Sequence, residues 1–248
     1  MRSDTIGRPM RYISPLPILI AAAAFSAEEA QTKRWSAHIE LSYVNTSGNT
    51  NTQTLSEKLE IKWEGEANRF FLKNSALYAT QEDKETANRI DVSGRWERLI
   101  TERFFGFLTT GYERDKFSGY TYKWNGGPGV GYDLLKTERH ELKTLLSVLY
   151  YYNRIEDDGI DNYTTFKAEV YYRWSILENL KLKEDINYIA NLSDTKTYFV
   201  NSDASLEVKV NEHISLGVGY KVAYQNKPPS PDVKRTDTTF STSLIVDF

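Results

Sequence analysis

The chain has 248 residues, with 31 Lys and Arg against 34 Asp and Glu, and it contains no cysteine. The absence of cysteine excludes disulfide frameworks, thiol catalysis and cysteine-ligated metal sites, and a formal net charge of -3 gives no positive field for nucleic acid. The unusual feature is the aromatic content, because Phe, Trp and Tyr make up 13% of the chain.

Residues 1–27 have the layout of a cleaved secretory signal peptide. Arg2, Arg8 and Arg11 precede a short apolar core, and small residues follow it where cleavage is expected. We therefore expect the mature chain to leave the cytoplasm. Residues 28–34 are polar and are predicted to form a short leader in front of one folded domain, residues 35–248.

From Trp35 onward, apolar and polar side chains alternate with the period of two that is typical of strands with two different faces. Phe166 and Val170, for example, fall opposite Lys167 and Glu169. The pattern predicts strands at 35–45, 52–63, 69–80, 88–99, 103–116, 120–133, 140–154, 163–176, 180–192, 197–210, 213–225 and 238–248. This is an even number of strands, as in single-chain bacterial outer-membrane barrels. In two of them the pairs Phe70/Phe71 and Phe104/Phe105 leave the register open.

The connections alternate in character. Those at 46–51, 81–87, 155–162 and 226–237 carry Gly, Asn, Asp or Pro and are predicted to be longer. Those at 64–68, 100–102, 177–179 and 211–212 are predicted to be tight turns. Gly126-Gly127-Pro128-Gly129 is interpreted as a bend or bulge inside a strand, and Asp157-Asp158-Gly159 as an exposed hairpin tip.

Three features predict that the apolar face points outward, toward lipid. A closed barrel of this strand number encloses more space than side chains readily fill, and the strands are long enough to cross hydrocarbon at a tilt. Aromatic rings also gather at both ends of the apolar stripes, where a bilayer has its interfaces. These are Trp35, Trp63, Trp96 and Trp174 toward the short turns, and Tyr43, Tyr152, Tyr188 and Tyr224 toward the other end. The alternative is a soluble barrel with an aromatic core.

The opposite face carries charges of both signs. The predicted lumen network consists of Glu40, Lys58, Glu60, Asp91, Arg95, Glu97, Lys167, Glu169, Arg173, Asp203, Glu207 and Lys209. Such charges can pair between neighbouring strands, and they would either brace a filled lumen or line a narrow aqueous path with little ion preference. Leu145 and Tyr151 also point inward, which favours a partly filled lumen.

A lipid-acting enzyme, such as an acyl hydrolase on a barrel, is the alternative function. It would need a nucleophile and a general base within reach, usually serine with histidine. Of the three histidines only His38 faces inward, near Ser36 and Ser42. We interpret these residues as ordinary lumen polarity, so no catalytic, cofactor-binding or metal-ligating residue is predicted.

Three short segments carry a family resemblance: SGNTN at 47–51, YERD at 112–115 and GVGY at 129–132. In these segments, and over nearly all of the mature length, the chain resembles the salt-induced outer-membrane protein family, although Pro128 cannot be matched to it. The resemblance implies an outer-membrane barrel linked to osmotic or salt stress, and it supplies no catalytic residues. The final strand also resembles those of other outer-membrane barrels in ending on an aromatic residue, Phe248, which the insertion machinery reads.

The sequence thus predicts an all-β, antiparallel up-and-down barrel in the outer membrane of a Gram-negative bacterium. The expected role is either structural, in the envelope, or slow passive passage of small solutes. The expected partners are outer-membrane lipid and the barrel-insertion machinery, with no nucleic acid and no cofactor. The sequence does not indicate an oligomeric state.

Overall fold

A computed structural model describes residues 34–46, 52–155, 159–194, 196–227 and 234–248. The predicted signal peptide, residues 28–33 of the leader, the 47–51 segment, and Asp157 and Asp158 lie outside these ranges. Within them no helix is long and apolar enough to cross a membrane.

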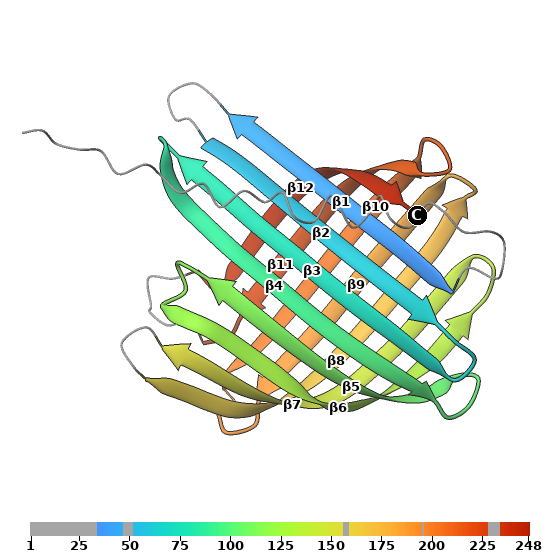
Figure 1. The fold of residues 1–248 in the computed structure, drawn as a ribbon, viewed down its shortest axis with the longest axis horizontal. Helices are drawn as coiled ribbons and strands as arrows, with labels where there is room; N and C mark the ends of the chain where they lie inside the picture. The colour runs from blue at the N-terminus through green and yellow to red at the C-terminus, as the bar shows by residue number, and fades with distance from the viewer. Residues whose placement is uncertain (1–33, 47–51, 156–158, 195, 228–233) are drawn as a thin grey trace, which may run out of the picture.

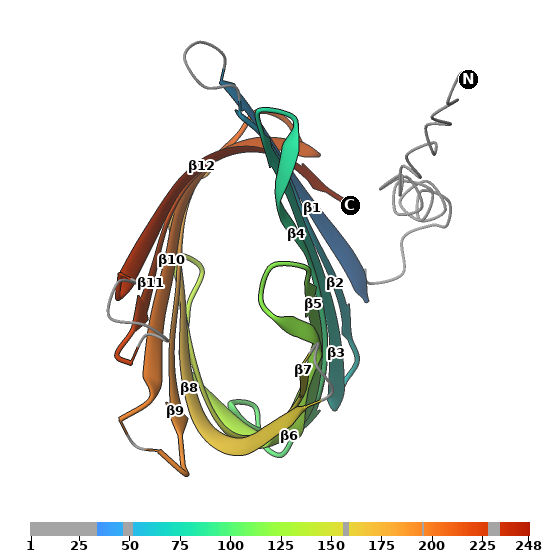
Figure 2. The same ribbon diagram turned by 90° about the vertical axis from the view of Figure 1, so that its left-hand side faces the viewer.

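The described residues form twelve strands that close into one barrel. The strands are β1 (Trp35–Thr46), β2 (Thr52–Glu64), β3 (Asn68–Gln81), β4 (Lys84–Leu99), β5 (Phe104–Asp115), β6 (Tyr120–Lys136), β7 (His140–Ile155), β8 (Ile160–Leu177), β9 (Leu180–Asn191), β10 (Tyr198–Lys209), β11 (Ile214–Gln225) and β12 (Thr236–Asp247). Each strand pairs antiparallel with its sequence neighbours, and β12 pairs with β1 (Figures 1 and 2). The predicted fold is confirmed, and every predicted strand overlaps its observed counterpart.

The third connection was predicted to be long, and this prediction is wrong. β3 and β4 are joined by only Glu82 and Asp83, whose φ angles are 49° and 59°. Positive φ at both central residues is what a tight type I′ hairpin turn requires. Gln81 pairs directly with Lys84, and a register shift at Ala79/Thr80 absorbs the difference in strand length.

The Gly126–Gly129 stretch lies inside β6, as predicted, and interrupts the ladder with β7 without the predicted bulge. Gly127 and Pro128 have no partner on β7. Gly126 pairs with Tyr150 and Gly129 with Ser147, so the register is the same on both sides of the gap. Proline has no N–H to donate, and a Cβ on Gly127 would lie 2.0 Å from the carbonyl oxygen of Val148. The register shifts of β6 against β7 lie elsewhere, at Tyr120/Tyr122 and Asp133/Leu135.

Contacts between strands that are not neighbours show which face points inward. Lys58 Nζ on β2 lies 4.0 Å from Asp203 Oδ2 on β10, although β1, β12 and β11 separate these strands in the ring. The Arg95 guanidinium on β4 similarly lies 6.0 Å from the ring centroid of Tyr171 on β8. Such pairs can meet only across the interior, so the charged face lines the lumen.

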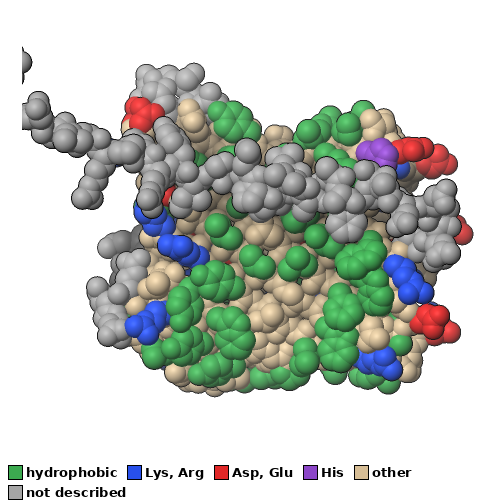
Figure 3. Space-filling model, viewed as in Figure 1, with side chains coloured by type: hydrophobic (Ala, Val, Ile, Leu, Met, Phe, Trp, Pro, Cys, Tyr) green, Lys and Arg blue, Asp and Glu red, His purple; other side chains and the backbone are tan. Residues whose placement is uncertain are grey.

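The apolar face therefore forms the outer surface, as predicted, and the charged interior is not the aromatic core of the alternative barrel. Leu216 and Val218 are 55% and 46% exposed on the outside of β11. In Figure 3 the larger hydrophobic side chains form two bands, one toward each end of the strands, with the charged side chains at the margins. The open registers are also settled: Phe70 is exposed on the outside, and Phe105 is fully buried inside.

Candidate functional site

The lumen is filled on the side of β5 and β7. Phe105, Phe107, Leu145 and Leu149 point into it and are at most 4% exposed. Three of them, Phe105, Phe107 and Leu145, form one cluster against which Tyr171 of β8 packs. The inward direction predicted for Leu145 is confirmed, and one cavity lies away from β5 and β7, among β3, β4 and β8 to β11.

Glycines on β6 make room for this filling. A Cβ on Gly129 would lie 2.1 Å from Cζ of Phe107, and one on Gly131 would lie 2.2 Å from Cζ of Phe105. The two rings thus lie directly over glycine backbone on the neighbouring strand. Because any larger inward side chain on β6 would displace them, the partial filling depends on the two strands together.

A buried ionic cluster lies beside these rings, toward the short turns. Glu97 on β4 is fully buried and is shared by two arginines. Arg69 Nε lies 2.7 Å from Glu97 Oε2, and Arg95 Nε lies 2.9 Å from Oε1. Asp133 on β6 is also nearly buried, 3.6 Å from Arg69 Nη1 and 3.8 Å from Lys143 Nζ.

This cluster contains three cations and two carboxylates, so it has one more positive than negative charge. The faces of neighbouring aromatic rings contact the cations. The Arg69 guanidinium lies 4.6 Å from the ring centroid of Phe105, and that of Arg95 lies 4.7 Å from Phe71. Lys143 Nζ lies 5.5 Å from the Phe105 ring. A cation over a ring face is attracted by the ring quadrupole, more strongly where water is excluded. The cluster therefore fixes the wall of the lumen near the short turns.

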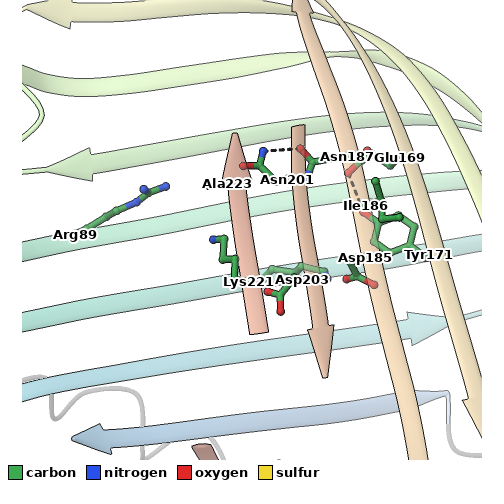
Figure 4. Close-up of a pocket in the computed structure, with 11 residues that line it drawn as sticks. Arg89, Glu169, Tyr171, Asp185, Ile186, Asn187, Asn201, Asp203, Lys221 and Ala223 are labelled. Carbon is green, nitrogen blue, oxygen red and sulfur yellow. Dashed lines mark hydrogen bonds between the residues drawn. The ribbon is translucent and has the colours of Figure 1, made fainter. Parts of the chain in front are cut away.

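The hollow side contains a cavity of about 390 Å³, here called the central chamber. Figure 4 shows its charged side chains converging from different strands. It is lined by Lys73, Arg89, Glu169, Tyr171, Asp185, Ile186, Asn187, Asn201, Asp203, Lys221 and Ala223. Anions come from β8 to β10, and cations from β3, β4 and β11. An amide hydrogen bond of 2.8 Å from Asn201 to Asn187 closes part of the wall.

A second cavity of about 380 Å³, the turn-end chamber, lies toward the short turns. Cations predominate among its lining side chains, which include Lys62, Arg69, Lys136 and Lys143. Lys73 and Tyr171 line both chambers. The two cavities are therefore adjacent along the barrel and meet at this pair of side chains.

Most of the predicted lumen charges form ion pairs in the structure. The pairs are Glu40–Lys58 at 3.2 Å, Glu60–Lys73 at 2.7 Å, Asp91–Arg89 at 2.8 Å, Arg95–Glu97 at 2.9 Å, Lys167–Glu169 at 2.8 Å, Arg173–Asp185, and Glu207–Lys183 at 2.5 Å. Asp203 reaches Lys58 only at 4.0 Å. Lys209 has no ion-pair partner among the described residues.

The predicted aromatic residues lie on the outer face at the two ends of the strands. Trp35 and Trp63 contact each other with ring centroids 6.3 Å apart, and Trp174 stacks on His140. At the other end Tyr198 contacts the rings of both Tyr188 and Tyr224. Trp96, Tyr43 and Tyr152 belong to the same two bands, and Trp96 and Tyr43 are 39% and 60% exposed.

His38 forms a contact that the sequence did not suggest. Its Nδ1 lies 2.6 Å from Asp247 Oδ1, so the side chain ties β1 to β12. Within the described residues no hydrogen bond joins a serine hydroxyl to this imidazole, and no group of three or more His, Asp or Glu is placed to hold a metal ion. The contact therefore adds a side-chain link to the backbone ladder between the first and last strands.

Sequence reasoning missed two members of the buried cluster, Arg69 and Asp133. Arg69 lies on the same face of β3 as Phe71 and Lys73. Its inward direction could not be predicted because the register was open at Phe70/Phe71. Asp133 lies on the same face of β6 as Gly129 and Gly131. Glycines have no side chain to mark a face as polar or apolar, so the pattern did not indicate that this face points inward. A run of glycines at every second position, opposite two phenylalanines on the preceding strand, is the signal that would have found this region.

The comparisons agree with this architecture. The profile of a family described as "Protein of unknown function, DUF481" matches residues 39–248. The uncharacterised protein YdiY of Escherichia coli K12 is 23% identical over 212 residues, which span 86% of this chain and 82% of that protein.

Two solved structures have the same overall fold. The COG4313 outer membrane channel from Pseudomonas putida F1 gives a TM-score of 0.51 at 8% identity, over 89% of this chain and 99% of that one. The NanC porin gives a TM-score of 0.50 at 8% identity, over 86% and 97%. At this identity the likeness concerns the fold alone, and the link to salt stress stays a prediction.

Proposed function

The chain belongs to the DUF481 family of proteins of unknown function, and we propose that it is an outer-membrane barrel through which small polar solutes pass slowly. The observation that carries the proposal is the pair of adjacent chambers in the lumen, which share Lys73 and Tyr171. The filling by Phe105 and Phe107 narrows the path beside them, so slow rather than free passage is expected.

The mixed charges of the lumen support weak ion selectivity. The central chamber is lined by Lys73, Arg89 and Lys221 against Glu169, Asp185 and Asp203, which balance in number. Opposite charges on facing walls give neither cations nor anions a continuous favourable path. The proposed solutes are therefore small and polar, and their passage would follow osmotic change as the family resemblance implies.

The outer-membrane location is part of this proposal. It is supported by the apolar outer surface, by the two bands of aromatic rings, and by folds shared with an outer membrane channel and a porin. Rings such as Trp35 and Tyr224 would lie at the two interfaces of the bilayer. Phe248, whose N–H donates to the carbonyl of Ala37 at 2.9 Å, would be read by the insertion machinery before the barrel closes.

Conductance of the purified protein in a planar bilayer tests the proposed passage. We expect small, steady, ohmic openings with weak ion selectivity, because the charges of the central chamber balance and only the turn-end chamber has an excess of cations. A silent bilayer would contradict the channel and would favour a purely structural barrel. Strong selectivity for one ion sign would contradict the proposed role of the mixed charges.

A further inference from the structure

The seam between the first and last strands is only partly paired. The described ladder between β1 and β12 runs from His38 and Asp247 to Leu41 and Leu244, and two backbone hydrogen bonds between Ala37 and Phe248 extend it toward the short turns. Every other neighbouring pair of strands is joined over most of its length. Figure 2 shows β1 and β12 meeting where the ring closes.

Beyond Leu41 and Leu244 the two strands continue without pairing to each other. The same register would place Ser42 opposite Ser243 and Tyr43 opposite Thr242, yet neither pair is present in the described ladder. On their other sides both strands remain paired, β1 with β2 to Thr46 and β12 with β11 to Thr236. Two strand edges therefore face each other across an interruption in the wall.

Unpaired edges are costly in lipid. Backbone N–H and C=O groups have no water to bond in hydrocarbon, so membrane barrels normally close completely. The two edges must then either pair with each other or border a passage. In a passage, water or a solute would form hydrogen bonds with their backbone N–H and C=O groups. No turn joins β1 to β12, so no turn geometry fixes the extent of their pairing.

The inner wall directly beside the interruption carries hydroxyl groups and glycines, and the nearest charges are the Glu40–Lys58 pair before it and Asp237 toward the far end of β12. Ser243 and Ser241 on β12 lie over Gly217 and Gly219 of β11, where an added Cβ would come within 2.6 and 2.8 Å of their hydroxyl oxygens. Ser42 on β1 pairs with Ser56 of β2. On the outer face Phe240 and Tyr43, on either side of the interruption, are 66% and 60% exposed.

We propose that β1 and β12 separate beyond Leu41 and Leu244 to form a lateral opening, through which uncharged amphipathic molecules pass between the lumen and the bilayer. The inner side offers hydrogen bonds from the hydroxyl groups of Ser42, Ser241 and Ser243, and the exposed aromatic rings on the outer side receive apolar groups. The 2.6 Å contact between His38 Nδ1 and Asp247 Oδ1 links the two strands in the paired part of the seam. This route requires the membrane location but not the ionic conductance proposed above.

A reversible cross-link tests the opening. Because the chain has no cysteine, the double variant Ser42→Cys/Ser243→Cys carries the only two thiols, one on each unpaired edge. The readout is uptake of N-phenyl-1-naphthylamine, an uncharged aromatic dye, by Gram-negative cells that produce the full chain. We expect oxidation to reduce uptake to the level of cells without the protein, and reduction of the disulfide to restore it. A bismaleimide replaces the disulfide where the thiols lie too far apart to join directly.

The matched control is Ser42→Cys/Ser56→Cys, which places a disulfide between β1 and β2 and leaves the seam alone. Its oxidation is expected to leave uptake unchanged. Uptake that survives cross-linking of residues 42 and 243, or wild-type uptake no greater than in cells without the protein, would overturn the proposal. Planar-bilayer conductance separates the two ideas: a silent bilayer with cross-link-sensitive uptake refutes only the aqueous channel, and a conducting protein with cross-link-insensitive uptake refutes only the lateral opening.

Discussion

Replacing Glu97 with leucine is expected to lower the free energy of unfolding by about 3–5 kcal/mol, the range for removing one partner of a buried ion pair. The carboxylate is fully buried and contacts both Arg69 and Arg95. Without it, two buried guanidiniums lose their closest anion, and Arg69 keeps only Asp133 at 3.6 Å. Urea unfolding in phospholipid vesicles, followed by tryptophan fluorescence, measures the change.

The control for this prediction is Glu60→Gln. Glu60 also forms a short ion pair, 2.7 Å to Lys73, but its side chain is 47% exposed to the water of the lumen. An exposed pair of this kind contributes at most about 1 kcal/mol. Equal losses in the two variants would show that the Glu97 cluster is as wet as the rest of the lumen, which would contradict the partly filled interior.

Placing arginine at Val218, on the outer face of β11, is expected to cost about 2–4 kcal/mol, as for a cation near the midplane of a bilayer. Val218 is 46% exposed, and the residues across from it on both neighbouring strands are uncharged. The guanidinium would therefore have no anion to meet and would remain in hydrocarbon. The same unfolding experiment in vesicles measures the loss.

Its counterpart is Ser205→Arg. Ser205 precedes Leu206, the partner of Val218 on β10, and therefore points into the lumen at nearly the same height. An arginine there would enter water beside existing carboxylates, so little change in stability is expected. If the lumen variant were the more damaging of the two, the assignment of inner and outer faces would be wrong.

The strands could be predicted because each depends on local pattern. Alternation with a period of two identifies a strand, and a turn between consecutive strands sets their register. Ambiguity remained only where two large apolar residues adjoin, as at Phe70/Phe71, since either one can then point outward. The short Glu82-Asp83 turn was missed because it contains no glycine or asparagine, the strongest signals of a type I′ turn, although aspartate adopts positive φ more readily than most residues.

The site was less predictable because it depends on pairs of strands. Phe105 and Phe107 can fill the lumen only because Gly129 and Gly131 lie beside them on β6. The alternation within one strand does not show which residues of the neighbouring strand lie beside it. The buried position of Glu97 follows from this filling, although its inward direction was predicted. The incomplete seam has no sequence signal, since β1 and β12 are the only neighbours without a connecting turn.

Tryptophan quenching by lipid-borne bromine tests most directly which face of the barrel meets the membrane. Trp35, Trp63, Trp96 and Trp174 lie on the outer face toward the short turns, and Trp124 is 41% exposed on the outside of β6. In vesicles of phospholipids brominated near the headgroup, the fluorescence of the refolded protein is expected to fall more than with bromine at the bilayer centre. Fluorescence that no brominated lipid quenches, from a protein that stays monodisperse in buffer without detergent, would contradict the account.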